Sequence, residues 1–113
     1  MDHYYPRLLL NETICKQNIA TMAKKARMNN VIFRPHFKTH QSDVVAQWFK
    51  DEGVEAITVS SVKMATYFAT AGWTDIFIAF PVNLLEIKAI NRLASQIELS
   101  VSVESEHSAR HLA

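Results

Sequence analysis

The chain has 113 residues, a formal net charge of +1, and 49% hydrophobic against 20% charged residues. This is the composition of an ordinary single globular domain. The near-neutral charge, spread along the chain, excludes a general attraction to nucleic acid or to an anionic membrane. No run of about 18 apolar residues exists that could form a transmembrane helix. The one cysteine, Cys15, cannot form an internal disulfide, and the first residues lack a secretory signal pattern, so we expect a cytoplasmic protein.

The first third of the chain combines helical and strand-like spacing of apolar residues. The leucines at 8–10 indicate a short strand or an extended arm. The spacing predicts a helix over 13–29, with Asn11 or Thr13 as its N-cap. The apolar residues at 31–33 then predict a buried strand.

The rest of the chain repeats this alternation. Gly53 and Gly72 stand where glycines end helices, and Asn83 followed by Glu86 resembles a capping box. A last helix begins at Ser105. The predicted elements are helices over 44–49, 62–69 and 87–94 and strands over 56–59, 76–80 and 97–103.

The order of elements indicates the fold class. Strands recur about every 20 to 25 residues with helices between them, which is the size of a βα unit. This pattern predicts a parallel sheet covered by helices. Two architectures fit it: an open doubly wound sheet, complete at about four strands, or half of an eight-stranded barrel, which typically needs about 250 residues.

The stretch that carries chemistry is Arg34-Pro35-His36-Phe37-Lys38-Thr39-His40, after the first predicted strand. Sites of α/β folds are built at this end of a strand. If the strand continued, Arg34, His36, Lys38 and His40 would share one face. Positive neighbours and partial burial would disfavour the charged form of Lys38. A neutral amine is what Schiff-base chemistry needs, and a nearby histidine can transfer protons near neutral pH.

This heptapeptide resembles the amino-terminal signature of the D-threonine aldolase and D-serine dehydratase group, which has the alanine-racemase-like fold. One departure is Gln41, where many members have lysine. Weaker similarities follow in the right order at residues 6–10, 53–59, 71–76 and 80–82, so the resemblance covers roughly residues 4–104. It implies an α/β fold that is a partial (β/α)8 TIM-type barrel, with about the first four βα units in a single incomplete domain over residues 1–113.

The resemblance also implies a function. Lys38 would form the internal aldimine with pyridoxal 5'-phosphate in an amino-acid lyase, aldolase, dehydratase or racemase. The group also has a carboxyl-terminal β-domain, a dimer in which both subunits contribute to each site, and a divalent metal whose ligands lie far downstream of this chain. Next to Lys38, we expect His36, Arg34, His40 and Thr58 to be cofactor-binding residues.

Other interpretations remain open for several of these residues. Arg34 would serve equally well in a structural ion pair, for example with Glu104, and the hydroxyl of Thr58 would simply satisfy a strand end. His36 and His40 do not suggest a metal pair, because on a strand they would lie roughly 13 Å apart.

Two alternatives to an active enzyme also remain. The phosphate-binding loops of such barrels follow strands seven and eight, so we expect the 113-residue chain alone to be inactive. It would then be a non-catalytic, self-associating fragment, a homodimer or higher oligomer with paired sheet edges. The other alternative is a small open-sheet α/β binding domain, although the chain has no glycine-rich phosphate loop.

Overall fold

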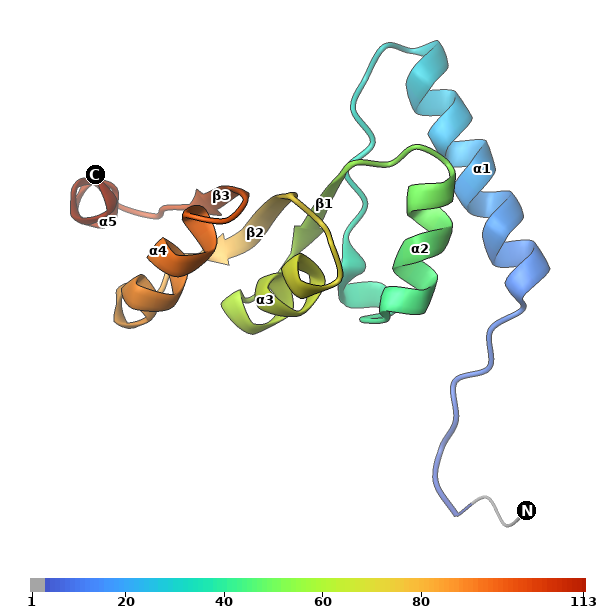
Figure 1. Ribbon diagram of the computed structural model, residues 1–113, viewed down its shortest axis with the longest axis horizontal. Coiled ribbons are helices and arrows are strands. Elements are labelled where there is room, and N and C mark those ends of the chain that lie inside the picture. The colour runs from blue at the N-terminus through green and yellow to red at the C-terminus, as the bar shows by residue number, and fades with distance from the viewer. Residues whose placement is uncertain (1–3) are drawn as a thin grey trace.

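The computed structural model describes residues 4–113. Its sheet has three parallel strands in the order β1-β2-β3, and a helix follows each strand (Figure 1). The strands are β1 (Ala56–Val59), β2 (Asp75–Pro81) and β3 (Glu98–Ser102), and the helices after them are α3 (Val62–Thr70), α4 (Ile87–Ala94) and α5 (Glu106–Leu112). The predicted βα alternation is therefore confirmed from residue 56 onward.

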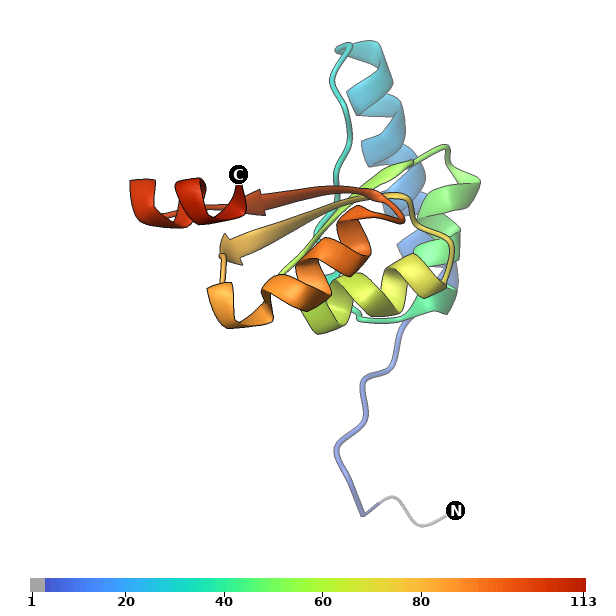
Figure 2. The same ribbon diagram turned by 60° about the vertical axis from the view of Figure 1, so that its left-hand side comes forward.

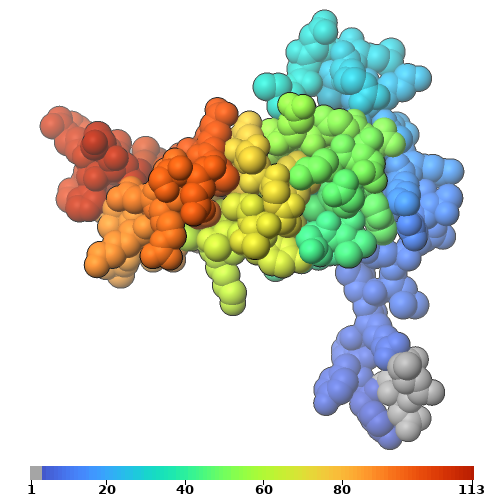
Figure 3. All heavy atoms as spheres, viewed as in Figure 1, coloured from blue at the N-terminus to red at the C-terminus, as the bar shows by residue number. Residues whose placement is uncertain are grey.

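The amino-terminal part contains two further helices, α1 (Glu12–Met28) and α2 (Asp43–Asp51), which contact each other. The N-cap of α1 is Asn11, whose Oδ1 accepts a hydrogen bond from the Ile14 amide at 3.1 Å. The residues before it, 4–10, form an exposed extended arm that reaches away from the rest of the molecule (Figure 3). No helix within residues 4–113 combines the length and the apolar character needed to cross a membrane.

Helix ends carry serine caps and the two predicted glycines, and one predicted cap has a different role. Ser42, Ser61 and Ser105 cap α2, α3 and α5 through their side chains. Gly53 and Gly72 follow α2 and α3 with φ of +82° and +97°, a conformation that glycine adopts without strain. Asn83 caps the short 3-10 helix η2 (Leu84–Glu86) that precedes α4, so it begins that turn and not the α-helix itself.

The core lies between one face of the sheet and the helices. In the strand register, Ile57 lies opposite Ile76, which lies opposite Leu99. These side chains pack against α2, α3 and α4, and Figure 2 shows α3 and α4 beneath the sheet with no helix over the opposite side of β2 and β3. The buried cluster consists of Phe37, Ala46, Val54, Ile57, Val59, Ala65, Phe68, Trp73, Ile76, Ile78 and Leu93.

The strand predicted at 31–33 is wrong. Val31 and Ile32 are 60% and 82% exposed, and the only strand-like contact of this segment is one parallel bridge between His36 and Thr58. Because His36 lies opposite Thr58, residues 31–33 fall opposite 53–55, which precede β1. They have no strand to pair with, so this apolar run stays extended, with Val31 and Ile32 exposed and only Phe33 packed against the core.

Candidate functional site

Lys38 lies on a tight turn at the carboxyl end of β1. The turn is the 3-10 helix η1 (Phe37–Thr39), which contacts β1. Phe37 is fully buried, and its ring lies within 4.6 to 5.1 Å of four other rings, those of His40, Phe49, Phe68 and Trp73. The next residue, Lys38, is exposed. The chain is therefore fixed in the core at Phe37, directly before the exposed side chain of Lys38.

Hydrogen bonds close this turn on both sides of the lysine. His36 Nδ1 accepts from the Lys38 amide at 3.2 Å, and Thr39 Oγ1 donates to the His36 carbonyl at 3.2 Å. The Gln41 amide donates to the Phe37 carbonyl at 2.9 Å. Gln41 has φ of +49°, a left-handed conformation that is uncommon for a residue other than glycine. The backbone that carries Lys38 is thus held in one shape.

The predicted shared face of Arg34, His36, Lys38 and His40 is wrong, because the alternation of a strand stops at the 3-10 turn. The ring of His40 packs into the aromatic cluster on the helix side, 4.6 Å from Phe37 and stacked on Phe49 at 5.8 Å. Burial lowers the pKa of His40, which favours its neutral form.

His36 keeps the expected proximity to Lys38. Burial, followed by the positive charge of Lys38, lowers its pKa, so His36 is a neutral imidazole near pH 7. Because His36 Nδ1 accepts the Lys38 amide, the ring carries its proton at Nε2. His36 lies opposite Thr58, which lies opposite Phe77 and then Ser100. This row faces away from the helices, and we call that side the open face.

Arg34 lies at the other end of the sheet from Lys38. Its Nη1 lies 2.9 Å from Asp75 Oδ1, at the start of β2, and donates to the Ile57 carbonyl at 3.1 Å. The ion pair suggested with Glu104 is therefore wrong, and the partner is Asp75. Glu104 instead accepts a short hydrogen bond from Ser108 at 2.6 Å, which lowers the pKa of that carboxyl.

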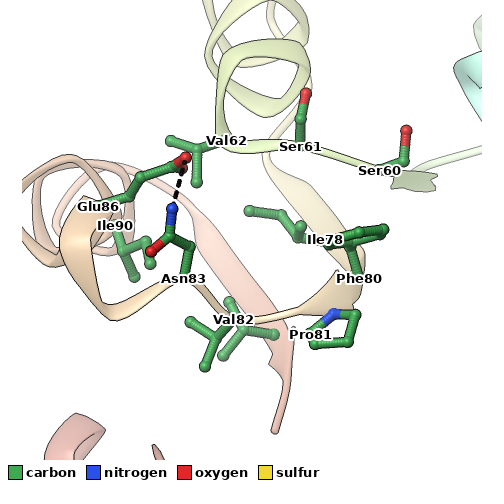
Figure 4. A pocket seen from close by; sticks show the side chains of 11 residues that line it. Ser60, Ser61, Val62, Ile78, Phe80, Pro81, Val82, Asn83, Glu86 and Ile90 are labelled. Carbon is green, nitrogen blue, oxygen red and sulfur yellow. Dashed lines mark hydrogen bonds between the residues drawn. The ribbon is translucent and has the colours of Figure 1, made fainter.

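A separate cavity of about 190 Å³ lies at the carboxyl edge of the sheet, near the starts of α3 and η2 (Figure 4). Its wall includes Ser61, Ile78, Phe80 and Asn83, and the Asn83 amide points toward Glu86 Oε1 at 3.5 Å. Lys38 does not line this cavity. The described residues contain no cluster of three or more His, Cys, Asp or Glu side chains that could hold a metal ion.

Three residues of this region were not predicted from the sequence. Asp75 pairs with Arg34, Tyr67 Oη accepts from the Asp43 amide at 3.1 Å, and Gln41 takes the left-handed conformation. Only Gln41 carried a signal, as the residue after the heptapeptide where many members of the similar group have lysine. The other two depend on strand register and on helix packing, which local sequence does not reveal.

No family model matches the chain. The D-threo-3-hydroxyaspartate dehydratase of Delftia sp. (strain HT23) is 33% identical over 99 residues, which are 85% of this chain and 26% of the dehydratase. The crystal structure of D-threonine aldolase from Filomicrobium marinum matches with a TM-score of 0.88 and 29% identity, over 95% of this chain and 29% of the aldolase. The structure of the Delftia sp. HT23 dehydratase matches with a TM-score of 0.86 and 31% identity, over 91% of this chain and 27% of that protein.

An alanine-racemase-like protein from Idiomarina loihiensis shares the fold, with a TM-score of 0.81 at 24% identity. The chain spans little more than a quarter of the length of these proteins. Over that span the sequence identity and the shared fold agree, which confirms the resemblance and the predicted α/β, barrel-type fold. The chain is therefore similar to the amino-terminal part of the alanine-racemase-like proteins that include D-threonine aldolase and D-threo-3-hydroxyaspartate dehydratase.

Proposed function

We propose that this chain is the amino-terminal part of a pyridoxal-phosphate-dependent enzyme acting on an amino acid, and that Lys38 attaches the cofactor. One observation carries the proposal: an exposed lysine stands on a fixed turn at the carboxyl end of β1, directly after a buried anchor, Phe37. Sites of barrel folds are built at this end of the strands.

The described residues fit the reactive end of pyridoxal phosphate. Lys38 supplies an exposed primary amine, and the neutral imidazole of His36 holds a proton at Nε2 beside it. Thr58 is the neighbour of His36 on the open face and contributes to the cofactor site from β1. Arg34 acts from the amino end, where its ion pair with Asp75 orients the segment that leads to the turn. When bound, pyridoxal phosphate supplies an electron sink for chemistry at the α-carbon of the substrate.

The reaction class follows from the relatives. Their names describe an aldolase for D-threonine and a dehydratase for D-threo-3-hydroxyaspartate, both of them 3-hydroxy amino acids. We propose an amino-acid lyase of this kind, with a racemase as the remaining option. A divalent metal is proposed only for a longer protein, because residues 4–113 present no metal-ligand cluster. Because the chain spans little more than a quarter of the length of its relatives, we expect the 113 residues by themselves to show no turnover.

The test is covalent labelling of the chain. Pyridoxal phosphate is added, the product is reduced with borohydride, and the modified lysines are identified by peptide mass mapping. We expect the reduced adduct to concentrate on Lys38, and to be lost in Lys38→Ala. The matched control is Lys88→Ala, since Lys88 is also an exposed lysine and lies on α4. Label that scatters over the surface lysines and survives in Lys38→Ala would refute the proposal.

A second role is favoured by the unpaired edge of the sheet. Within residues 4–113, β3 has β2 on one side and no strand on the other. An unpaired edge exposes backbone groups that can pair with another chain. We propose that the chain alone forms a homodimer or higher oligomer through this edge. Sedimentation over a range of concentrations tests it, and a monomer mass at every concentration would contradict it.

A further inference from the structure

The imidazole of His40 has a feature that the chemistry proposed for Lys38 does not use. Its ring is enclosed by Phe37, Phe49 and Phe68, at centroid distances of 4.6, 5.8 and 6.2 Å. Its Nε2 is buried and has no hydrogen-bond partner among the described residues. A buried polar atom without a partner costs stability. A leucine or phenylalanine would fill this space without that cost, so the histidine must serve another purpose.

The hydrogen bond of the other ring nitrogen, Nδ1, indicates that purpose. His40 Nδ1 accepts a hydrogen bond from the Ser42 amide at 3.0 Å. In a neutral imidazole with Nδ1 as the acceptor, the proton is on Nε2. A protonated imidazole carries hydrogens on both nitrogens and accepts no bond. The contact to Ser42 therefore requires the neutral ring.

This contact closes the far end of the turn that carries Lys38. Ser42 is the N-cap of α2, so the bond joins the turn to the start of that helix. Phe37 fixes the near end in the core. Between these anchors, Gln41 adopts φ of +49°, a conformation that the surrounding structure must hold in place. Lys38 thus stands between the buried ring of Phe37 and the half-buried ring of His40.

We propose that His40 is a positioning residue, whose neutral ring locks the turn that presents the Lys38 amine, and that it does not itself contact a cofactor. The inference rests on the proposed function for the use of that amine, whereas the locking of the turn stands without it. Protonation of His40 removes the bond to Ser42 and releases the turn.

Charged neighbours do not alter this conclusion. The elements packed against His40 are the turn itself, α2 and α3. None of their titratable side chains is a cause of the lowered pKa of His40, which comes from burial. They are Lys38 in the turn, Asp43, Lys50 and Asp51 on α2, and Lys63 and Tyr67 on α3.

The first test observes the ring directly. The 113-residue chain, labelled with ¹⁵N-histidine, is followed by long-range proton–nitrogen NMR from about pH 8 to about pH 5. We expect His40 to be the Nε2–H tautomer and to stay neutral to lower pH than a solvent-exposed imidazole does. Free ¹⁵N-histidine measured in the same buffers provides the reference signals. An Nδ1–H tautomer, or protonation together with the reference signals, would overturn the proposal.

The second test separates the ring from its acceptor nitrogen. His40→Phe keeps an aromatic ring and loses the acceptor, whereas His40→Asn keeps an acceptor two residues before Ser42 and loses the ring. We expect His40→Phe to speed hydrogen exchange of the Ser42 amide about five- to tenfold, with β1 unaffected, and His40→Asn to restore part of the protection. Unchanged exchange in folded His40→Phe would overturn the proposal. If both variants fail to fold, the NMR of the unaltered chain decides it.

The link to Lys38 is read from the labelling experiment. In His40→Phe, the reduced adduct on Lys38 should fall several-fold relative to that on Lys88, and His40→Asn should recover part of it. An unchanged ratio would show that the turn does not govern the amine. If the unaltered chain gives no adduct on Lys38, the proposed function fails, while the tautomer and exchange data still decide the role of His40.

Discussion

The two sides of the sheet are built in opposite ways. The helix side holds a closed cluster in which Phe37, Phe68 and Ile57 are fully buried. The open face carries Arg34, His36 and Thr58, which are polar, and Arg34 pairs there with Asp75. The helix side provides the buried apolar contacts of the core, and the open face is the side to which we assign the proposed chemistry. The lysine turn joins them, since Phe37 belongs to the first side and Lys38 is exposed beside the second.

The two histidines beside Lys38 show the same contrast. Each accepts a backbone amide at Nδ1, His36 from Lys38 and His40 from Ser42. His36 belongs to the row of the open face, and its hydrogen bond at Nδ1 leaves the ring proton at Nε2. The Nε2 of His40 is enclosed and has no partner within the described residues. Identical side chains four residues apart therefore have different surroundings, and the roles that we propose for them differ accordingly.

The largest expected effect is on the free energy of unfolding, when a phenylalanine of the core and one of the open face are each replaced by alanine. Phe37→Ala removes a fully buried ring and should lower the free energy of unfolding by about 3 to 5 kcal/mol. Phe77→Ala, on the open face, is the matched control and should cost about 1 kcal/mol. Urea unfolding followed by circular dichroism measures both. Equal losses would show that the open face is packed as firmly as the core.

A smaller effect is expected for the ion pair at the amino end of the open face. Arg34 and Asp75 are 29% and 30% exposed in their side chains, so the pair is partly shielded from water. A double-mutant cycle with Arg34→Met and Asp75→Asn should give a coupling free energy of about 1 kcal/mol, which decreases with added salt. A coupling near zero would mean that Arg34 is fixed by the Ile57 carbonyl alone.

The pH dependence of stability should distinguish the two histidines. Burial lowers the pKa of both from the ordinary value of 6.5. Between the folded-state pKa and 6.5, the unfolded chain binds more protons. The contribution of the two neutral histidines to the free energy of unfolding is therefore fully present above pH 6.5. It is lost as the pH falls from 6.5 through the folded-state pKa. Urea unfolding at several pH values should show a flatter dependence in His40→Phe than in His36→Asn, because His40 is the more buried. Equal slopes would argue against this difference.

The smallest effect is expected for Thr58. The residue is 8% exposed, and its hydroxyl makes no hydrogen bond within residues 4–113. Thr58→Val should therefore change the free energy of unfolding by less than about 0.5 kcal/mol. The reduced adduct on Lys38 should nevertheless decrease, if the hydroxyl serves the cofactor. A stability loss without a change in labelling would assign Thr58 to the core alone.

Local patterns in the sequence determined most of the elements. The helix over 13–29, the strands at 56–59 and 76–80, and the glycine signals at helix ends were all predicted, because caps and periodicity act within a few residues. The heptapeptide around Lys38 pointed to the group of relatives that the comparisons then confirmed. These features depend on short-range physics or on residue identity, which the sequence states directly.

Tertiary structure alone decided the rest. The register of β1 left residues 31–33 without a neighbouring strand, although their apolar pattern was typical of a buried one. The burial of Phe37 turned the chain into a 3-10 helix and separated His40 from His36. The partner of Arg34 is Asp75 because parallel pairing places the start of β2 beside that segment. In each case the outcome depends on contacts between residues distant in the chain, which periodicity cannot encode.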